Sequence, residues 1–187
     1  MWRFVNCLGV GILCFTSLVA TADGGFYLSA QAGPSRVKFD ETILPQVGDK
    51  ATNTVGVYAS AGYRTPFNLV LEVGGGYGEN LDAFGSTFDN YELSELRASI
   101  GFVIPFGEHF RLVPKAGRYR WRLGAEEGQF LNNGPELSTA IHDTEGHLQL
   151  DSEVPLLDWL ALDFSYFYAD TAFGTVRSYR AGVQFEF

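Results

Sequence analysis

Apolar and polar side chains alternate through most of the chain. Between residues 26 and 187, eight segments of about ten residues place an apolar side chain at every second position, as where Leu162 and Phe164 flank Asp163. Alternation with a period of two is the pattern of a β-strand whose two faces meet different surroundings. Clusters of Gly, Pro, Asn and Asp separate the segments, as turns between strands would. The pattern therefore predicts an all-β fold of eight strands.

The connections between the predicted strands alternate in length. The short ones hold residues 65–67, 105–109 and 157–159, and the long polar ones lie near residues 34–52, 78–91, 123–145 and 169–177. Bacterial outer-membrane barrels have short periplasmic turns and longer outer loops. The predicted strands also have the roughly 9–11 residues that a tilted membrane strand needs. We therefore predict an eight-stranded antiparallel up-and-down transmembrane β-barrel, located in the outer membrane.

The two faces of the predicted strands separate a membrane barrel from a soluble one. The apolar face carries aromatic residues near the strand ends, as a girdle at two membrane interfaces would. These residues are Tyr63, Tyr77, Phe102, Tyr166, Tyr168, Phe185 and Phe187. The other face alternates small residues with charged ones, which are Arg64, Arg97, Arg111, Lys115 and Arg180 with Glu72, Glu95, Asp151, Glu153, Asp163 and Glu186. These charges nearly balance, whereas the whole chain has a formal net charge of −9.

Balanced charges indicate that the charged face is turned away from water. A buried charge is tolerated only when it is paired and hydrogen-bonded, and a solvated face has no reason to balance. The interior of an eight-stranded barrel is just wide enough for side chains to fill it. We therefore predict a packed polar interior with an ion-pair cluster at its centre, made of Glu72, Arg97, Lys115, Glu153, Asp163 and Arg180.

The first 22 residues have the features of a cleaved secretory signal peptide. Arg3 precedes an apolar run from Cys7 to Ala20, and small residues then form a cleavage site. The apolar run is shorter than the ~20 residues of a membrane-spanning helix. We therefore divide the chain into a signal peptide, residues 1–22, and a barrel domain, residues 23–187.

The charged face also carries a family resemblance. From Asp23 to Phe187 the chain resembles the eight-stranded transmembrane domain of outer membrane protein A and the small stand-alone barrels related to it. The segment 115–122 is similar to that domain's fifth strand, where a basic interior residue precedes a Gly-rich stretch and a Trp-Arg pair. Glu72, Lys115 and Glu153 fall where that barrel has interior charges of the same sign.

Two further positions bear on this resemblance. The chain departs from the family at Asp163, where the family places a basic residue. The ending 184–187 resembles the terminal-aromatic signal that the barrel-assembly machinery reads, with Phe187 as the aromatic residue. The resemblance therefore implies a protein of the Gram-negative cell envelope whose partners include outer-membrane lipids and this machinery.

A run of arginines leaves two orientations open. Arg118, Arg120 and Arg122 alternate with Tyr119 and Trp121. Strict alternation would point the arginines at lipid, which costs about 2–4 kcal/mol each at the midplane but little near an interface. A β-bulge near Gly117 would instead turn them inward and place the two aromatic residues in the outer girdle, and we favour this bulge. The alternative function of the arginines is a patch that binds lipopolysaccharide phosphates through paired hydrogen bonds.

A small set of ionisable residues lies near the outer end of the sixth predicted strand. It consists of His142, Asp143, Glu145 and His147. A metal or hydrolytic site needs convergent geometry that spacing does not supply, so we interpret this set as part of a solvated loop. The His-x-Ser arrangement of outer-membrane lipid A deacylases is missing, because Thr144 stands where Ser would be. We therefore predict no catalytic residue, no metal site and no cofactor.

Composition and charge narrow the function further. The acidic net charge of −9 argues against a nucleic-acid partner. The 22 glycines favour strands and turns over helices. The expected role is non-enzymatic: envelope structure, or contact of the outer loops with a host or neighbouring surface. The alternatives are a deacylase-like lipid A-modifying enzyme and a narrow pore, which the predicted ion-pair cluster opposes.

Overall fold

The computed structural model describes residues 25–39, 51–80, 91–125, 141–172 and 174–187. They form β1 (Gly25–Phe39), β2 (Ala51–Arg64), β3 (Leu69–Asn80), β4 (Tyr91–Phe102), β5 (Ile104–Pro105), β6 (Arg111–Ala125), β7 (Ile141–Leu157), β8 (Leu160–Thr171) and β9 (Gly174–Glu186). None of these residues belongs to a helix long and apolar enough to cross a membrane. The signal peptide expected at residues 1–22 lies outside the described residues.

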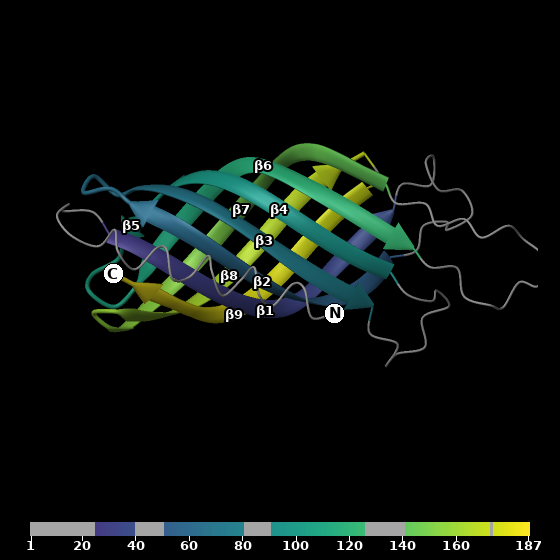
Figure 1. The fold of residues 1–187 in the computed structure, drawn as a ribbon. Coiled ribbons are helices and arrows are strands. Elements are labelled where there is room, and N and C mark those ends of the chain that lie inside the picture. Colours follow the sequence, from purple (N-terminus) through teal and green to yellow (C-terminus); the bar gives the residue numbers. More distant parts are fainter. Residues whose placement is uncertain (1–24, 40–50, 81–90, 126–140, 173) are drawn as a thin grey trace, which may run out of the picture.

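The strands form one closed antiparallel sheet (Figure 1). Neighbours in sequence pair from β1 to β4 and from β6 to β9, while β1 pairs with β9 and β4 pairs with β6. The two-residue strand β5 continues the line of β4 and pairs with the start of β6. The result is a closed eight-stranded antiparallel barrel, which confirms the predicted fold class.

The two ends of the barrel differ in their connections. The short turns that follow β2, β5 and β7 gather at one end, which we call the short-turn end (Figure 1). Residues 40–50, 81–90 and 126–140 connect strands at the other end, which we call the long-connection end. The first residue of β1 and the last residue of β9 both lie at the short-turn end.

The strands are staggered and therefore tilted. A row of paired residues that starts at Arg122 on β6 returns to Leu112, ten residues earlier on the same strand. On the way it passes Ser94, Tyr77, Val57, Ala32, Ala181, Phe164 and Ser152. This stagger over eight strands corresponds to a tilt of roughly 40°. Each row therefore climbs about 3 Å toward the long-connection end with every strand crossed from β6 through β7 to β9.

Alternation divides the side chains between the outer wall and the interior of the barrel. On the wall, Val57 and Tyr179 are 64% and 63% exposed. In the interior, Asp163 and Arg180 are 2% and 3% exposed. The apolar face of the strands is thus the outer wall, and the charged face lines the interior, as the alternation predicted.

Two interior glycines make room for tyrosine rings that lie flat against the inner surface of the sheet. A Cβ atom at Gly62 would come within 2.2 Å of Cζ of Tyr27. A Cβ atom at Gly76 would come within 2.2 Å of Cδ1 of Tyr58. A side chain at either position would therefore displace a ring. Small and large residues alternate in this way to fill a narrow barrel.

The strands extend further toward the long-connection end than the sequence predicted. The prediction of a long connection at 169–177 was wrong, because β8 continues to Thr171 and β9 begins at Gly174. The Thr171 hydroxyl donates a hydrogen bond to the Gly174 carbonyl oxygen at 2.6 Å, and Gly174 has a φ of 140°, so the chain turns tightly there. Polar residues end the apolar band of a membrane barrel but need not end the strand.

Candidate functional site

The middle of the barrel interior holds a group of paired charges. Lys115 on β6 forms ion pairs with Glu72 on β3 and, at 2.6 Å, with Asp151 on β7. The hydroxyl of Tyr27 on β1 donates a hydrogen bond to Oε2 of Glu72 at 2.7 Å. The hydroxyl of Ser165 on β8 donates one to Oδ1 of Asp151. Side chains from five strands therefore meet across the interior at this level.

A second group of charges lies next to the first. Nη1 of Arg97 is 2.8 Å from Oε1 of Glu95, and Nη1 of Arg180 is 3.1 Å from the same oxygen. Nε of Arg97 is also 3.7 Å from Oε1 of Glu72, which links the two groups. The Arg180 guanidinium lies 3.5 Å from the centroid of the Tyr58 ring, close enough for a cation–π contact. One carboxylate therefore pairs with two guanidinium groups from opposite sides of the barrel.

A third group of charges lies at the short-turn end. Arg64 forms ion pairs with Glu153 at 2.5 Å and with Glu186 at 2.6 Å. Arg111 approaches the same two carboxylates, at 3.9 Å and 2.6 Å respectively. This group is partly open to solvent at Arg111 and Glu186, whose side chains are 29% and 21% exposed, whereas Glu153 is buried. A cavity of about 290 Å³ lies beside them, lined among others by Tyr27, Arg64, Arg111 and Glu186.

Asp163 is held by neutral donors rather than by a cation. Its Oδ2 atom accepts hydrogen bonds from Nε2 of Gln31 at 2.6 Å and from the hydroxyl of Ser29 at 3.2 Å. No ion pair among the described residues includes Asp163. Its cross-strand neighbour on β7 is a second carboxylate, Glu153. The two donors on β1 therefore hydrogen-bond to one oxygen of Asp163, where the family resemblance implied a basic residue.

The residues of the predicted central cluster are all buried, but they do not form one cluster. Glu72, Arg97, Lys115, Glu153, Asp163 and Arg180 are between 1% and 5% exposed. The structure brings the first three together, joins Arg180 to them through Glu95, and leaves the other two acids apart. Glu95 and Asp151 are central partners that the predicted cluster omitted. The alternation did place both on the charged face, so only their depth was misjudged.

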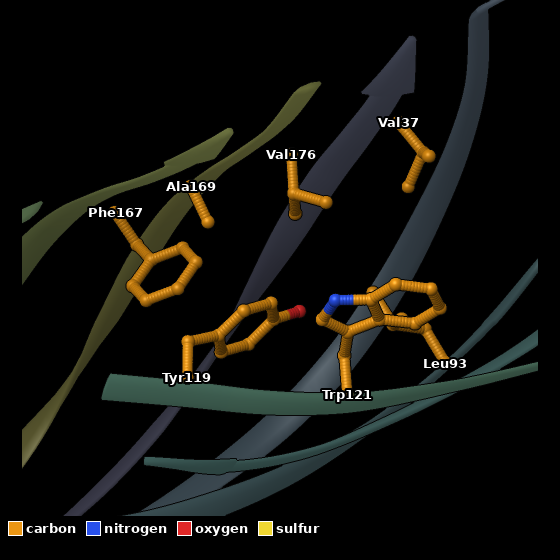
Figure 2. Close-up of a cluster of buried hydrophobic side chains, with 7 residues drawn as sticks. All are labelled: Val37, Leu93, Tyr119, Trp121, Phe167, Ala169 and Val176. Atoms are coloured by element: carbon orange, nitrogen blue, oxygen red, sulfur yellow. The ribbon is translucent and has the colours of Figure 1, made fainter. Parts of the chain in front are cut away.

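The long-connection end of the interior is apolar (Figure 2). This apolar cap consists of Val37, Leu93, Tyr119, Trp121, Phe167, Ala169 and Val176, each at most 3% exposed. Figure 2 shows Tyr119 and Trp121 side by side on one strand, with Phe167 across from Tyr119. The Tyr119 and Phe167 ring centroids are 5.0 Å apart, a usual distance for an aromatic pair. Side chains from five strands thus fill this end of the interior.

The predicted bulge near Gly117 is wrong. β6 pairs with β4 and with β7 in continuous register through this region, so strict alternation continues. Arg118, Arg120 and Arg122 are exposed on the outer wall, whereas Tyr119 and Trp121 are buried. The physical reason is the position of these arginines along the barrel axis, because an arginine on the outer wall costs little free energy near a membrane interface. Two large rings meanwhile fill space that would otherwise be empty.

His147 lies inside the barrel, so its interpretation as part of a solvated loop was wrong. Its side chain is 4% exposed, and Nε2 is 3.0 Å from the Ser99 hydroxyl. No carboxylate among the described side chains hydrogen-bonds to His147, and the pair faces the interior rather than lipid. Asp143 is exposed and Glu145 is half-buried, while the side chain of His142 lies outside the described residues. Within the described segments no group of three His, Cys, Asp or Glu residues could hold a metal ion.

The last residue of the chain lies at the short-turn rim. Phe187 is 58% exposed, and its N–H donates a hydrogen bond to the carbonyl oxygen of Phe26 at 2.9 Å. Phe185 stacks on Trp159 with ring centroids 6.2 Å apart. These exposed rings form part of an aromatic girdle at this end of the outer wall.

The comparisons with known proteins agree with this geometry. Residues 6–187 match the family model of the outer membrane protein beta-barrel domain. A comparison with curated protein sequences finds no significant match. The match confirms the predicted kinship with small outer-membrane barrels and locates the chain in the outer membrane.

Solved structures of outer-membrane barrels share the fold. Ail of Yersinia pestis has a TM-score of 0.64 and 16% identity, over 89% of this chain and 100% of that one. Neisserial surface protein A has a TM-score of 0.64 and 18% identity, over 87% of this chain and 97% of that one. The N-terminal barrel domain of Pseudomonas aeruginosa OprF has a TM-score of 0.50 and 17% identity, over 86% and 97%. At these identities the likeness establishes the fold alone.

Proposed function

Because this chain belongs to the outer membrane protein beta-barrel domain family, we propose that it is a closed barrel that neither conducts ions nor catalyses a reaction. Its role is envelope structure, or surface interaction through its outer end. The short-turn end faces the periplasm and the long-connection end faces outward, since bacterial barrels have short periplasmic turns and longer outer loops.

The filled interior is the observation that supports this proposal. Ion pairs around Glu72 and Lys115 cross the middle of the barrel, and the apolar cap covers them on the outward side. An ion that enters the apolar cap would lose its hydration without gaining a partner, which is strongly unfavourable. The Ser99–His147 pair is enclosed in the same interior, where no lipid ester reaches it.

Surface interaction is the second part of the proposal. One solved structure contains Ail of Yersinia pestis in complex with the heparin analogue sucrose octasulfate. For the present chain we place a host or neighbouring-surface ligand at the outward connections 40–50, 81–90 and 126–140, which lie outside the described residues. Loops on a rigid scaffold are the usual carriers of such recognition.

Two contacts with the envelope belong to the same proposal. The exposed arginines 118, 120 and 122 meet lipopolysaccharide phosphates from the outer wall, since guanidinium groups suit phosphate oxygens. Phe187 serves as the terminal aromatic residue that the barrel-assembly machinery reads. Its exposed ring at the short-turn rim supports this role.

Planar-bilayer recording tests the closed interior. Folded protein, identified by a gel mobility that changes on boiling, is expected to give no steady conductance. A variant with Tyr119→Ala and Trp121→Ala removes much of the apolar cap and leaves the ion pairs in place, so it is also expected to remain closed. Steady conductance of the folded wild-type protein would contradict the proposal.

A lipid-hydrolysis assay tests the absence of catalysis. The folded protein is incubated with lipid A and with phospholipid, and released fatty acids are measured by mass spectrometry. We expect no release above that of the His147→Ala variant. Release that depends on His147 would reassign the protein as a lipid-modifying enzyme.

A further inference from the structure

Two arginines stand directly opposite each other on the outer wall. Arg36 on β1 pairs with Arg177 on β9, and both side chains are exposed. Like charges in directly opposite positions destabilise a sheet. No ion pair in the described part of the chain includes either arginine. The Arg177 guanidinium instead lies 5.8 Å from the centroid of the Tyr168 ring. Among the described residues, the pair therefore has no carboxylate that would offset its repulsion.

A groove begins on the same two strands, on the side of the arginines that faces the short-turn end. It measures about 470 Å³ and opens on the outer wall. Its lining includes the small residues Ala32, Pro34 and Ala181 and the aromatic residues Phe164, Tyr166 and Tyr179. The lining also includes Ser152, Ser165 and Arg180, but its exposed residues are apolar or aromatic. Pro34 and Tyr179 are the next residues on the outer wall below Arg36 and Arg177, toward the short-turn end. The guanidinium pair therefore stands at the outer end of a groove with a largely apolar surface.

The pairing of β1 with β9 is interrupted where the groove runs. Paired residues continue from the short-turn end to Ala32 and Ala181, and pairing resumes at Ser35 and Ser178. Gly33 and Pro34 between them have no partner on β9. Proline has no backbone N–H to donate to a sheet, and it therefore interrupts the pairing. The two strands still lie close together there, since a Cβ atom at Gly33 would come within 1.9 Å of the Tyr179 carbonyl oxygen. The short side chains beside the larger rings therefore leave the hollow on the wall.

The stagger of the strands sets the depth of the two arginines. The row that starts at Ala116 on β6 passes Leu148 and Tyr168 and reaches Arg177 and then Arg36. Because the row climbs about 3 Å along the barrel axis with each strand, Arg177 and Arg36 lie at about the height of Arg120 and Arg122. Tyr168, at nearly the same level, belongs to the aromatic girdle that marks a membrane interface. The arginines therefore lie where lipid phosphates lie, and the groove lies beside the acyl chains.

We propose that Arg36 and Arg177 bind one phosphate group of a lipopolysaccharide molecule, and that an acyl chain of the same molecule occupies the groove below them. Two guanidinium groups on adjacent strands can bracket a phosphate with paired hydrogen bonds, and its negative charge removes their mutual repulsion. The proposal rests on the outward orientation of the long-connection end given above, because that orientation puts the site in the lipopolysaccharide leaflet. It adds a site that holds a phosphate and an acyl chain of one lipid together to the phosphate contacts proposed above for Arg118, Arg120 and Arg122.

The test compares variants of the full barrel by native mass spectrometry. Folded protein in detergent is titrated with diphosphoryl lipid A, with its dephosphorylated form and with phosphatidylglycerol. The variant with Arg36→Gln and Arg177→Gln loses charged hydrogen bonds, so its affinity for diphosphoryl lipid A should fall by about tenfold or more. It should also lose the preference for the phosphorylated form. Ala181→Phe fills the groove and should weaken binding of both forms of lipid A.

A matched control separates a site from a general positive charge. The variant with Arg36→Lys and Arg177→Lys keeps both positive charges but loses the paired guanidinium hydrogen bonds, so it should bind diphosphoryl lipid A more weakly than the wild type and more tightly than the Gln variant. Wild-type affinity in the Lys variant would show that positive charge alone holds the lipid and would overturn the proposal, as would no loss in the Gln variant. Phosphatidylglycerol that binds as tightly as lipid A, with the same dependence on Arg36 and Arg177, would overturn the assignment to lipopolysaccharide. Each variant is first shown to be folded by its gel shift and closed by bilayer recording, so a failure here leaves the proposed closed barrel intact.

Discussion

The two ends of the barrel interior are filled in different ways. From the short-turn end to the middle, charged side chains cross the interior in pairs. At the long-connection end, seven buried side chains form the apolar cap. An ion pair needs a partner at the right depth on another strand, whereas apolar packing needs only matching volume. The interior of a small barrel can therefore be polar in one part and apolar in another, provided that both parts are packed.

The same difference predicts how each region responds to mutation. Removing one member of a buried ion pair leaves an uncompensated charge, which costs about 3–5 kcal/mol. Changing one apolar side chain to another of similar volume usually costs less than about 1.5 kcal/mol. The charged region should therefore be sensitive to single substitutions and the apolar cap tolerant of them.

The largest expected effect is that of Glu72→Ala. Glu72 is the shared partner of Lys115, Arg97 and Tyr27. Its loss should lower the free energy of unfolding by about 3–5 kcal/mol. The measurement is urea unfolding in lipid vesicles, followed by tryptophan fluorescence. Glu108→Ala, in an exposed turn, is the control and should change stability by less than about 0.5 kcal/mol. An equally small change for Glu72→Ala would mean that its carboxylate is solvated.

A smaller effect is expected from Phe167→Leu in the apolar cap. Phe167 packs against Tyr119 and stacks on His147. Leucine keeps the site apolar but loses the ring contacts, so the free energy of unfolding should fall by about 1 kcal/mol. Phe164→Leu, on the outer wall of the same strand, is the matched control and should change it by less than about 0.5 kcal/mol. Equal changes in both variants would show that the apolar cap adds nothing beyond nonspecific burial.

The smallest effect is expected from Arg120→Leu. Arg120 is exposed on the outer wall and forms no ion pair among the described residues. Stability in the same unfolding assay should stay within about 0.5 kcal/mol of the wild type. Arg97→Leu, on the adjacent strand but buried, should instead lose about 3 kcal/mol or more. A loss of that size for Arg120→Leu would favour an inward orientation of the arginine run.

The strand faces could be predicted from the sequence because alternation depends only on residue type. Leu162 and Asp163 go to opposite faces whatever the neighbouring strands do. The pairing of charges could not be predicted, because it depends on the stagger between strands. That Asp163 lies beside Glu153 and accepts hydrogen bonds from β1 can be predicted only once the register is known. Depth along the barrel is therefore the information that the linear pattern lacks.

The apolar cap shows a second limit of sequence reasoning. Large rings and arginines alternate in β6, and either set could have been placed on the wall. The unbroken alternation from Lys115, which faces inward, was the signal that settles the orientation of Tyr119 and Trp121. The prediction of a bulge instead relied on the free-energy cost of arginine in a membrane. That cost is small for these arginines, because they lie near the interface. A regular pattern should yield to a bulge only where a break in the alternation marks one.

The seam between β1 and β9 has a consequence for biogenesis. It joins residues near the two ends of the described chain, such as Tyr27 and Glu186, so its contacts have the longest separation in sequence. Contacts of this kind form late, because closing such a long loop is entropically unfavourable until the intervening hairpins are in place. The barrel can therefore seal only after its final strand has been delivered. A newly made chain must keep the edge of β1 protected from other partners until then.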